Sequence, residues 1–146
     1  MATSNAIKTL SNLSARQSED AAKRLGQANR THDKNEQQLN LLIEYRKSYA
    51  DQLHIQMSHG VSVIDYNNFQ QFMAALDQAI TQQKQVLQVS LQFIEKERNH
   101  WQVCERKRLS FDTLTQRAQQ EQLDKEKSLD QKQTDEHASR QYSSLK

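Results

Sequence analysis

Apolar residues recur along the first part of the chain in alternating steps of four and three, the spacing of a heptad repeat. The repeat predicts a long helix over residues 4–57. We call the row of positions that would face a partner helix the seam, and in this segment it contains Ala21, Leu25, Ala28, His32, Asn35, Leu39, Leu42, Arg46, Tyr49 and Leu53. Nearer the start, Ile7, Leu10 and Leu13 continue an apolar face.

A break interrupts this repeat at residues 58–67. It holds Gly60, one of only two glycines in the chain, together with most of the β-branched residues of the region. Glycine punctuates regular structure, so the break predicts a turn. Asp65 or Asn67 is expected to cap the helix that follows.

The second helix is predicted over residues 68–130, with the same alternating spacing. Its seam contains Phe69, Met73, Leu76, Ile80, Gln83, Leu87, Ser90, Ile94, Glu97, Trp101, Cys104, Arg108, Phe111, Thr115, Ala118 and Gln122. Apolar residues thin out beyond Leu129. Residues 131–146 are therefore expected to form a frayed tail.

Two heptad helices joined by one short break predict an all-α fold, a long antiparallel two-helix coiled-coil hairpin that forms a single domain over residues 1–146. The arms would be roughly 80 Å and up to about 110 Å long at 1.5 Å per residue. Leu25 is expected to face the neighbourhood of Ile94 to Trp101. Polar seam residues such as His32 and Glu97 fix the register but reduce stability.

Two rows of side chains include residues outside the seam that a two-stranded coiled coil does not need for its packing. They contain Gln38, Leu42, Tyr45 and Tyr49 in the first helix, and Phe72, Leu76, Ala79 and Gln83 in the second. Tyr45 and Phe72 lie on the flank of the seam, where a two-helix coil leaves side chains partly exposed. Exposed aromatic residues on a helix flank favour recognition of a partner protein. The alternative is that these flank positions only widen the seam.

Composition narrows the possible functions. The 146 residues include no proline, two glycines and one cysteine, which argues against a many-stranded β fold, a glycine-rich phosphate loop and an internal disulfide. The net charge of +2 comes from interspersed acidic and basic residues, so we expect no nucleic-acid partner. The sequence shows neither a secretory signal nor an apolar stretch long enough to cross a membrane, so a cytoplasmic location is expected.

The residues that could bind a metal or take part in catalysis do not form a recognisable site in the sequence. No two of the five histidines have the i, i+4 spacing of a helical metal site, and we expect no metal and no cofactor. Cys104 reads as a small apolar filler of the seam. A two-helix coil offers no water-excluding pocket, so we expect neither catalytic residues nor a small-molecule substrate. The charged segment 95–108 reads as a solvated helix face, with a docking patch for an acidic protein as the alternative.

Three sequence segments, in order and at their distances, resemble the FliJ family of flagellar type III export proteins. They are DAAKRLG at residues 20–26, EQQLNLLIEYR at 36–46 and NFQQFMAALDQAI at 68–80. The likeness covers most of residues 7–110.

The resemblance implies a non-enzymatic stalk similar to the γ subunit of rotary ATPases. Such a stalk inserts into the ring of the hexameric flagellar export ATPase, promotes its assembly and activity, contacts the export gate membrane protein, and binds and recycles export chaperones of minor filament subunits. It would act at the cytoplasmic face of the inner membrane, at the flagellar base. An export chaperone or a coiled-coil scaffold of a virulence-type III secretion system is the alternative.

The resemblance also assigns surfaces. The two rows that contain Tyr45 and Phe72 would face the export gate. The ends of the helices would face the ATPase ring through Ile7, Leu10, Leu13, Phe111 and Leu114.

Overall fold

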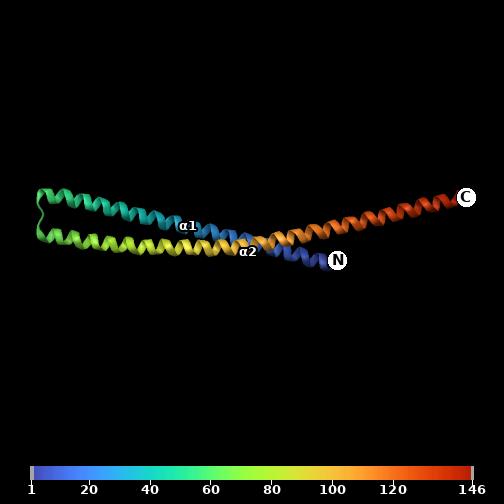
Figure 1. Ribbon diagram of the computed structural model, residues 1–146, viewed down its shortest axis with the longest axis horizontal. Helices are drawn as coiled ribbons and strands as arrows, with labels where there is room; N and C mark the ends of the chain where they lie inside the picture. The colour runs from blue at the N-terminus through green and yellow to red at the C-terminus, as the bar shows by residue number, and fades with distance from the viewer. Residues whose placement is uncertain (1, 146) are drawn as a thin grey trace. The chain divides into compact units, whose positions relative to one another are not determined.

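The computed structural model describes residues 2–145, so the predicted domain limits at positions 1 and 146 lie outside the described residues. Helix α1 spans Ala2–His59 and helix α2 spans Val63–Ser144. All other described residues, Gly60, Val61, Ser62 and Leu145, are non-helical. The prediction of an all-α helical hairpin is confirmed (Figure 1).

The turn is shorter than the sequence predicts. Gly60 adopts φ 90°, a left-handed conformation that glycine tolerates best, and its N–H donates to the Met57 carbonyl at 3.3 Å. Helix α2 then starts at Val63, because the Ser62 hydroxyl accepts from the Asp65 N–H at 3.1 Å. Ser62 is therefore the N-cap, and the prediction of Asp65 or Asn67 in that role is wrong.

The last part of α2 is helical through Ser144, so the predicted helix end at residue 130 is wrong. Every residue from 119 to 144 is exposed, which means that packing does not sustain this segment. Local interactions sustain it: the segment is rich in Gln, Glu and Lys, contains neither Gly nor Pro, and has i, i+4 pairs such as Gln120 with Asp124 at 3.1 Å. The scarcity of apolar residues beyond Leu129 therefore indicates that this segment lacks tertiary contacts, but it does not indicate that the helix ends.

The described chain divides into two compact units, to which both helices contribute. Unit 2 contains residues 21–101 and includes the turn; unit 1 contains residues 2–20 and 102–145. That the chain forms one domain stays a prediction.

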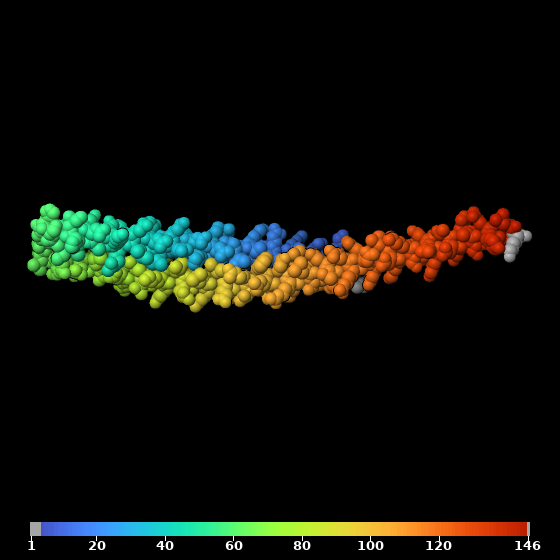
Figure 2. Space-filling view, turned by 45° about the horizontal axis from the view of Figure 1, so that its top comes forward, coloured from blue at the N-terminus to red at the C-terminus, as the bar shows by residue number. Residues whose placement is uncertain are grey.

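The seam of unit 2 is the predicted one. Each predicted seam residue from Ala21 to Leu53 and from Phe69 to Trp101 is buried or half-buried. The antiparallel register is fixed by polar contacts across it: Asn35 Nδ2 donates to the Ser90 hydroxyl at 2.7 Å, and Gln83 Nε2 donates to the Asn35 carbonyl at 2.9 Å. Figures 1 and 2 show the two segments side by side up to the turn.

Glu97 is the most deeply buried polar group of unit 2, with its side chain 2% exposed. Its Oε1 accepts from Arg24 Nη2 at 3.1 Å, which confirms that the region of Leu25 faces Ile94 to Trp101. Its Oε2 is buried without a hydrogen-bond donor. A buried carboxylate oxygen left unsatisfied is destabilising, so this contact specifies register at the expense of stability.

In unit 1 the α1 seam contains serines, and Leu10 and Leu13, which the sequence analysis placed on an apolar face, lie outside it. Ser14 and Ser18 are 3% and 4% exposed, whereas Leu10 and Leu13 are about half exposed (45% and 50%). The 4-3 spacing, counted back from Ala21, falls on Ser18, Ser14, Ser11 and Ile7. The repeat therefore decides which side of α1 faces α2, and it selects serines in this unit.

Two of the serines, Ser11 and Ser18, bond to α2 across the seam of unit 1, whereas the Ser14 hydroxyl donates to the Ser11 carbonyl of its own helix at 2.9 Å. The Ser18 hydroxyl donates to Glu105 Oε2 at 2.5 Å, and the Ser11 hydroxyl donates to Asp112 Oδ1 at 3.3 Å. On α2 the seam runs through Cys104, which is buried, to Ala118. The predicted last seam position, Gln122, is exposed, because α1 begins at Ala2 and no described residue lies opposite it.

Glu105 links the two helix segments of unit 1 in a pH-dependent way. Hydrogen bonds from the Arg108 guanidinium, and secondly from the Ser18 hydroxyl, lower the pKa of Glu105 from its ordinary 4.5 to about 2. A carboxyl whose pKa is lower in the folded protein than in the unfolded chain stabilises the fold at pH values above its unfolded-chain pKa. It loses this effect as the pH falls towards its pKa in the folded protein.

We therefore expect Glu105→Gln to lower the melting temperature near pH 7, and the difference from wild type to vanish as the pH falls from about 4.5 to about 2. Circular dichroism melts of both proteins at pH 7 and at pH 2 measure the two differences in melting temperature. An equal difference at pH 7 and pH 2 would contradict the prediction.

Candidate docking surface

Four aromatic rings from both helices gather near the turn-proximal end of unit 2. Tyr49 stacks at a tilt on Phe72 with ring centroids 4.4 Å apart, and Tyr45 meets Phe72 edge-on at 6.3 Å. Tyr49 also lies 5.2 Å from Tyr45 and 6.1 Å from Phe69. Separations of this size fall within the favoured range for aromatic pairs, so the rings stiffen one another.

The cluster is only partly covered. Tyr45 is 51% exposed and Phe72 is 36% exposed, whereas Tyr49 and Phe69 are half-buried seam residues. The expectation that Tyr45 and Phe72 are partly exposed is confirmed. The structure thus offers aromatic groups that are held by neighbouring rings and still present about half of Tyr45 and a third of Phe72 to solvent.

The two predicted rows meet in the structure. Besides the aromatic contacts, Gln83 Nε2 lies 3.5 Å from Gln38 Oε1, at the far end of the rows from the turn. We call the following eight residues the aromatic surface: Gln38, Leu42, Tyr45, Tyr49, Phe72, Leu76, Ala79 and Gln83. Leu76 is buried (7% exposed) and serves the core, so the accessible part rests on Gln38, Tyr45 and Phe72.

The five residues assigned to the ATPase-facing ends all lie in unit 1. Ile7 and Phe111 are half-buried in its seam. Leu10, Leu13 and Leu114 are about half exposed. Of the five residues, these three leucines present the most apolar surface to a partner protein.

Two apolar regions escaped the sequence analysis. Around the turn, Val63 and Ile64 are 76% and 73% exposed and Met57 is 53% exposed; beside them, a shallow groove of about 400 Å³ is lined by Leu53, Met73 and others. Farther along α2, Val86, Val89 and Phe93 are exposed on a flank of the seam. The spacing of these last three was readable from the sequence, since Phe93 lies three heptads after Phe72.

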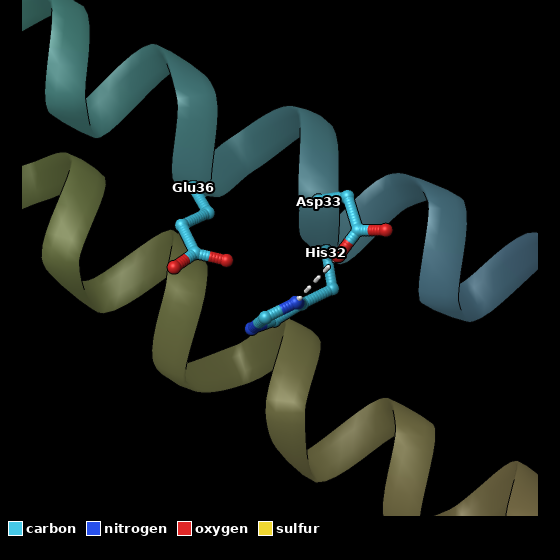
Figure 3. Close-up of side chains that lie close together, drawn as sticks. All are labelled: His32, Asp33 and Glu36. Atoms are coloured by element: carbon cyan, nitrogen blue, oxygen red, sulfur yellow. Dashed lines mark hydrogen bonds and ion pairs between the residues drawn. The ribbon is translucent and has the colours of Figure 1, made fainter.

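One cluster of metal-ligand types occurs among the described residues: His32, Asp33 and Glu36, whose ligand atoms lie within 4.8 Å of one another (Figure 3). His32 is a half-buried seam residue whose Nδ1 lies 3.5 Å from Asp33 Oδ1. Asp33 and Glu36 are exposed. One imidazole and two solvated carboxylates on a single helix do not enclose a cation, so the cluster supports no metal assignment.

Part of the positive charge of segment 95–108 is paired with carboxylates. Arg108 donates from Nε to Glu105 and from Nη1 to Asp112 at 2.9 Å, so its charge is largely compensated within unit 1. Trp101 is half-buried. The interpretation as a solvated helix face around a covered tryptophan suits this arrangement better than a dedicated acidic-partner site.

Comparison with known proteins identifies the family. Residues 3–145 match the family described as flagellar FliJ protein. A flagellar FliJ protein of Escherichia coli (strain K12) is 36% identical over 140 residues, which cover 96% of this chain and 95% of the relative. The chain belongs to the FliJ family. A FliJ protein of Salmonella typhi is 32% identical over the same shares of both chains.

FliJ membership makes the chain a component of flagellar protein export and confirms the resemblance seen in the three sequence segments. FliJ proteins are not a known family of enzymes. Within residues 2–145, neither helix has a stretch long and apolar enough to cross a membrane.

Proposed function

We propose that this FliJ-family chain is a non-enzymatic stalk of the flagellar type III export apparatus, acting at the cytoplasmic face of the inner membrane at the flagellar base. It inserts into the ring of the hexameric export ATPase and promotes assembly and hydrolysis. It also contacts the export gate membrane protein and binds and recycles export chaperones of minor filament subunits. The observation that carries the proposal is family membership over residues 3–145 in a chain whose described residues form a helical hairpin.

The aromatic surface is proposed to face the export gate. Its accessible side chains, Tyr45 and Phe72, are large, held by neighbouring rings, and lose little conformational freedom on binding. Aromatic residues of this kind dominate the energetics of protein interfaces. No catalytic role is assigned, because a stalk acts through contact and not through chemistry.

Unit 1 is proposed to face the ATPase ring. Its exposed leucines, Leu10, Leu13 and Leu114, supply apolar contact area, while Ile7 and Phe111 hold the two helix segments together. Contacts with several non-equivalent subunits of a ring need an elongated, varied surface more than a pocket. The alternative is an export chaperone or scaffold of a virulence-type III secretion system; the flagellar names of both relatives favour the first reading.

ATP hydrolysis by the purified export ATPase tests the proposal. Adding the full chain is expected to raise the rate and the fraction of hexamer. A Leu13→Asn, Leu114→Asn variant should lower this stimulation about tenfold or more, because polar groups replace apolar contacts at the ring. Leu41→Asn changes a leucine of unit 2 that is 63% exposed and is the matched control, expected to stimulate like wild type. Stimulation by all three proteins alike would refute the assignment of unit 1; no stimulation at all would refute the stalk.

A further inference from the structure

Helix α2 carries a second heptad row outside its packed seam. Beginning at Phe72, apolar or neutral residues recur in alternating steps of three and four, and the row, here called the second seam, contains Phe72, Ala75, Ala79, Gln82, Val86, Val89 and Phe93. The packed seam of the same stretch uses different residues, among them Leu76, Ile80 and Leu87. A helix with two heptad rows is built to pack against two other helices.

The second seam is partly covered at its beginning, where Phe72 stacks on Tyr49 of α1, and is exposed from Val86 to Phe93. Val86, Val89 and Phe93 are 44%, 63% and 49% exposed, although each is fully apolar. Tyr45 of α1 borders its beginning through the edge-on contact with Phe72. Three exposed apolar side chains in one row, on a helix that is otherwise mostly polar, favour an interaction site.

One flank of the second seam carries an uncharged residue at every seventh position. Glutamine recurs every seven residues beside it, at Gln71, Gln78, Gln85 and Gln92, and all four are exposed. The only acidic residue of α2 between residues 71 and 93 is Asp77, which pairs with Arg46. The next step of the row after Phe93 is Lys96. The surface is therefore apolar and neutral along its length and positive at its end.

From these observations we infer that the second seam binds an amphipathic helix of a partner protein as a third strand beside α2. The partner helix has an apolar heptad row of about three heptads, roughly 32 Å at 1.5 Å per residue, with acidic residues at the end that lies over Lys96. Phe72 and Phe93 act as its aromatic anchors, and Ala75 and Ala79 allow close approach between them. The site extends past the aromatic surface, and its existence does not depend on the contact with the export gate.

A designed peptide of about 24 residues is the probe. It has leucines at alternating steps of three and four, glutamine and alanine elsewhere, and two glutamates at one end. One control peptide has lysines in place of the glutamates, and another has the same composition in scrambled order. Fluorescence anisotropy of labelled peptide is recorded against the full chain.

The acidic peptide is expected to bind, the lysine peptide about threefold to fivefold more weakly, and the scrambled peptide not measurably. Val89→Asn, Phe93→Asn should weaken binding of the acidic peptide about tenfold or more. Leu91→Asn is the matched control, because Leu91 is 46% exposed on the other side of the packed seam and should leave binding unchanged. Far-UV circular dichroism verifies that both variants stay helical.

Absence of binding, equal binding of the scrambled peptide, or equal loss in the Leu91 variant would overturn the inference. A second copy of the chain as occupant would overturn it too, and would appear in sedimentation as a concentration-dependent dimer abolished by the Phe93 variant. None of these outcomes bears on the export gate, which is absent from the assay.

Discussion

Replacing Glu97 by leucine should make the protein more stable. The Glu97 side chain is 2% exposed, and one of its carboxylate oxygens is buried without a hydrogen-bond donor. Substituting apolar residues for buried ionic groups is often neutral or stabilising by about 1–4 kcal/mol. Because leucine also completes the seam between Ile94 and Trp101, we expect the free energy of unfolding to rise by about 1–3 kcal/mol. Denaturant and thermal melts followed by circular dichroism measure it.

Removing Arg24, the partner of Glu97, should instead lower the free energy of unfolding. Arg24→Met leaves the Glu97 carboxylate buried with neither oxygen paired to a cation, so unfolding should become easier by about 2 kcal/mol. This is below the loss for a fully buried pair, because Arg24 is 62% exposed and water can partly replace it. Glu95→Leu, the same change at an exposed site two residues away, is the control and should alter stability little. A Glu97→Leu protein less stable than wild type would show that the Arg24–Glu97 contact is a net source of stability.

Changing both Tyr45 and Phe72 to alanine should abolish binding to the export gate and swimming motility while the hairpin remains helical. Tyr45 is 51% and Phe72 36% exposed, and both lie outside the seam positions, so their removal should delete an anchor while the seam residues keep the hairpin folded. Co-purification with the cytoplasmic part of the gate protein and swim-plate assays measure the loss, expected at tenfold or more in binding.

The matched control for this variant is Ile43→Ala, Leu91→Ala. These side chains are 43% and 46% exposed, come from the same two helices, and lie off the aromatic surface. Binding and motility should be retained. If the Tyr45 and Phe72 variant loses its far-UV helical signal, the rings belong to the core and the alternative of a widened seam holds.

The periodic part of the fold was predictable because one physical rule governs it. Steps of four and three place every seam residue of unit 2 correctly, and the same rule, extended back from Ala21, leads to Ser18 and Ser14, the two buried serines of unit 1. Burial of serine contradicts simple hydropathy. It is possible here because the small side chain fits between closely packed helices and its hydroxyl finds an acceptor, as Ser18 does in Glu105.

Features set by local geometry were harder to predict. The start of α2 depends on which of several polar residues bonds back to the helix, and Ser62 does so in place of Asp65. For the candidate site, the sequence indicated both aromatic rows, yet only the folded chain shows that Tyr49 and Phe72 stack and that Leu76 is buried. Contacts between side chains that are distant in sequence depend on register, which polar pairs such as Asn35 and Ser90 fix.

The central claim is that one chain contacts the export ATPase through unit 1 and the export gate through the aromatic surface. Site-specific photo-cross-linking in flagellated cells tests it most directly, with a photoreactive phenylalanine analogue placed at Leu13 in one strain and at Phe72 in another. The account predicts an adduct with the ATPase from position 13 and an adduct with the gate protein from position 72. Adducts in the reverse order, or with neither protein, would contradict it.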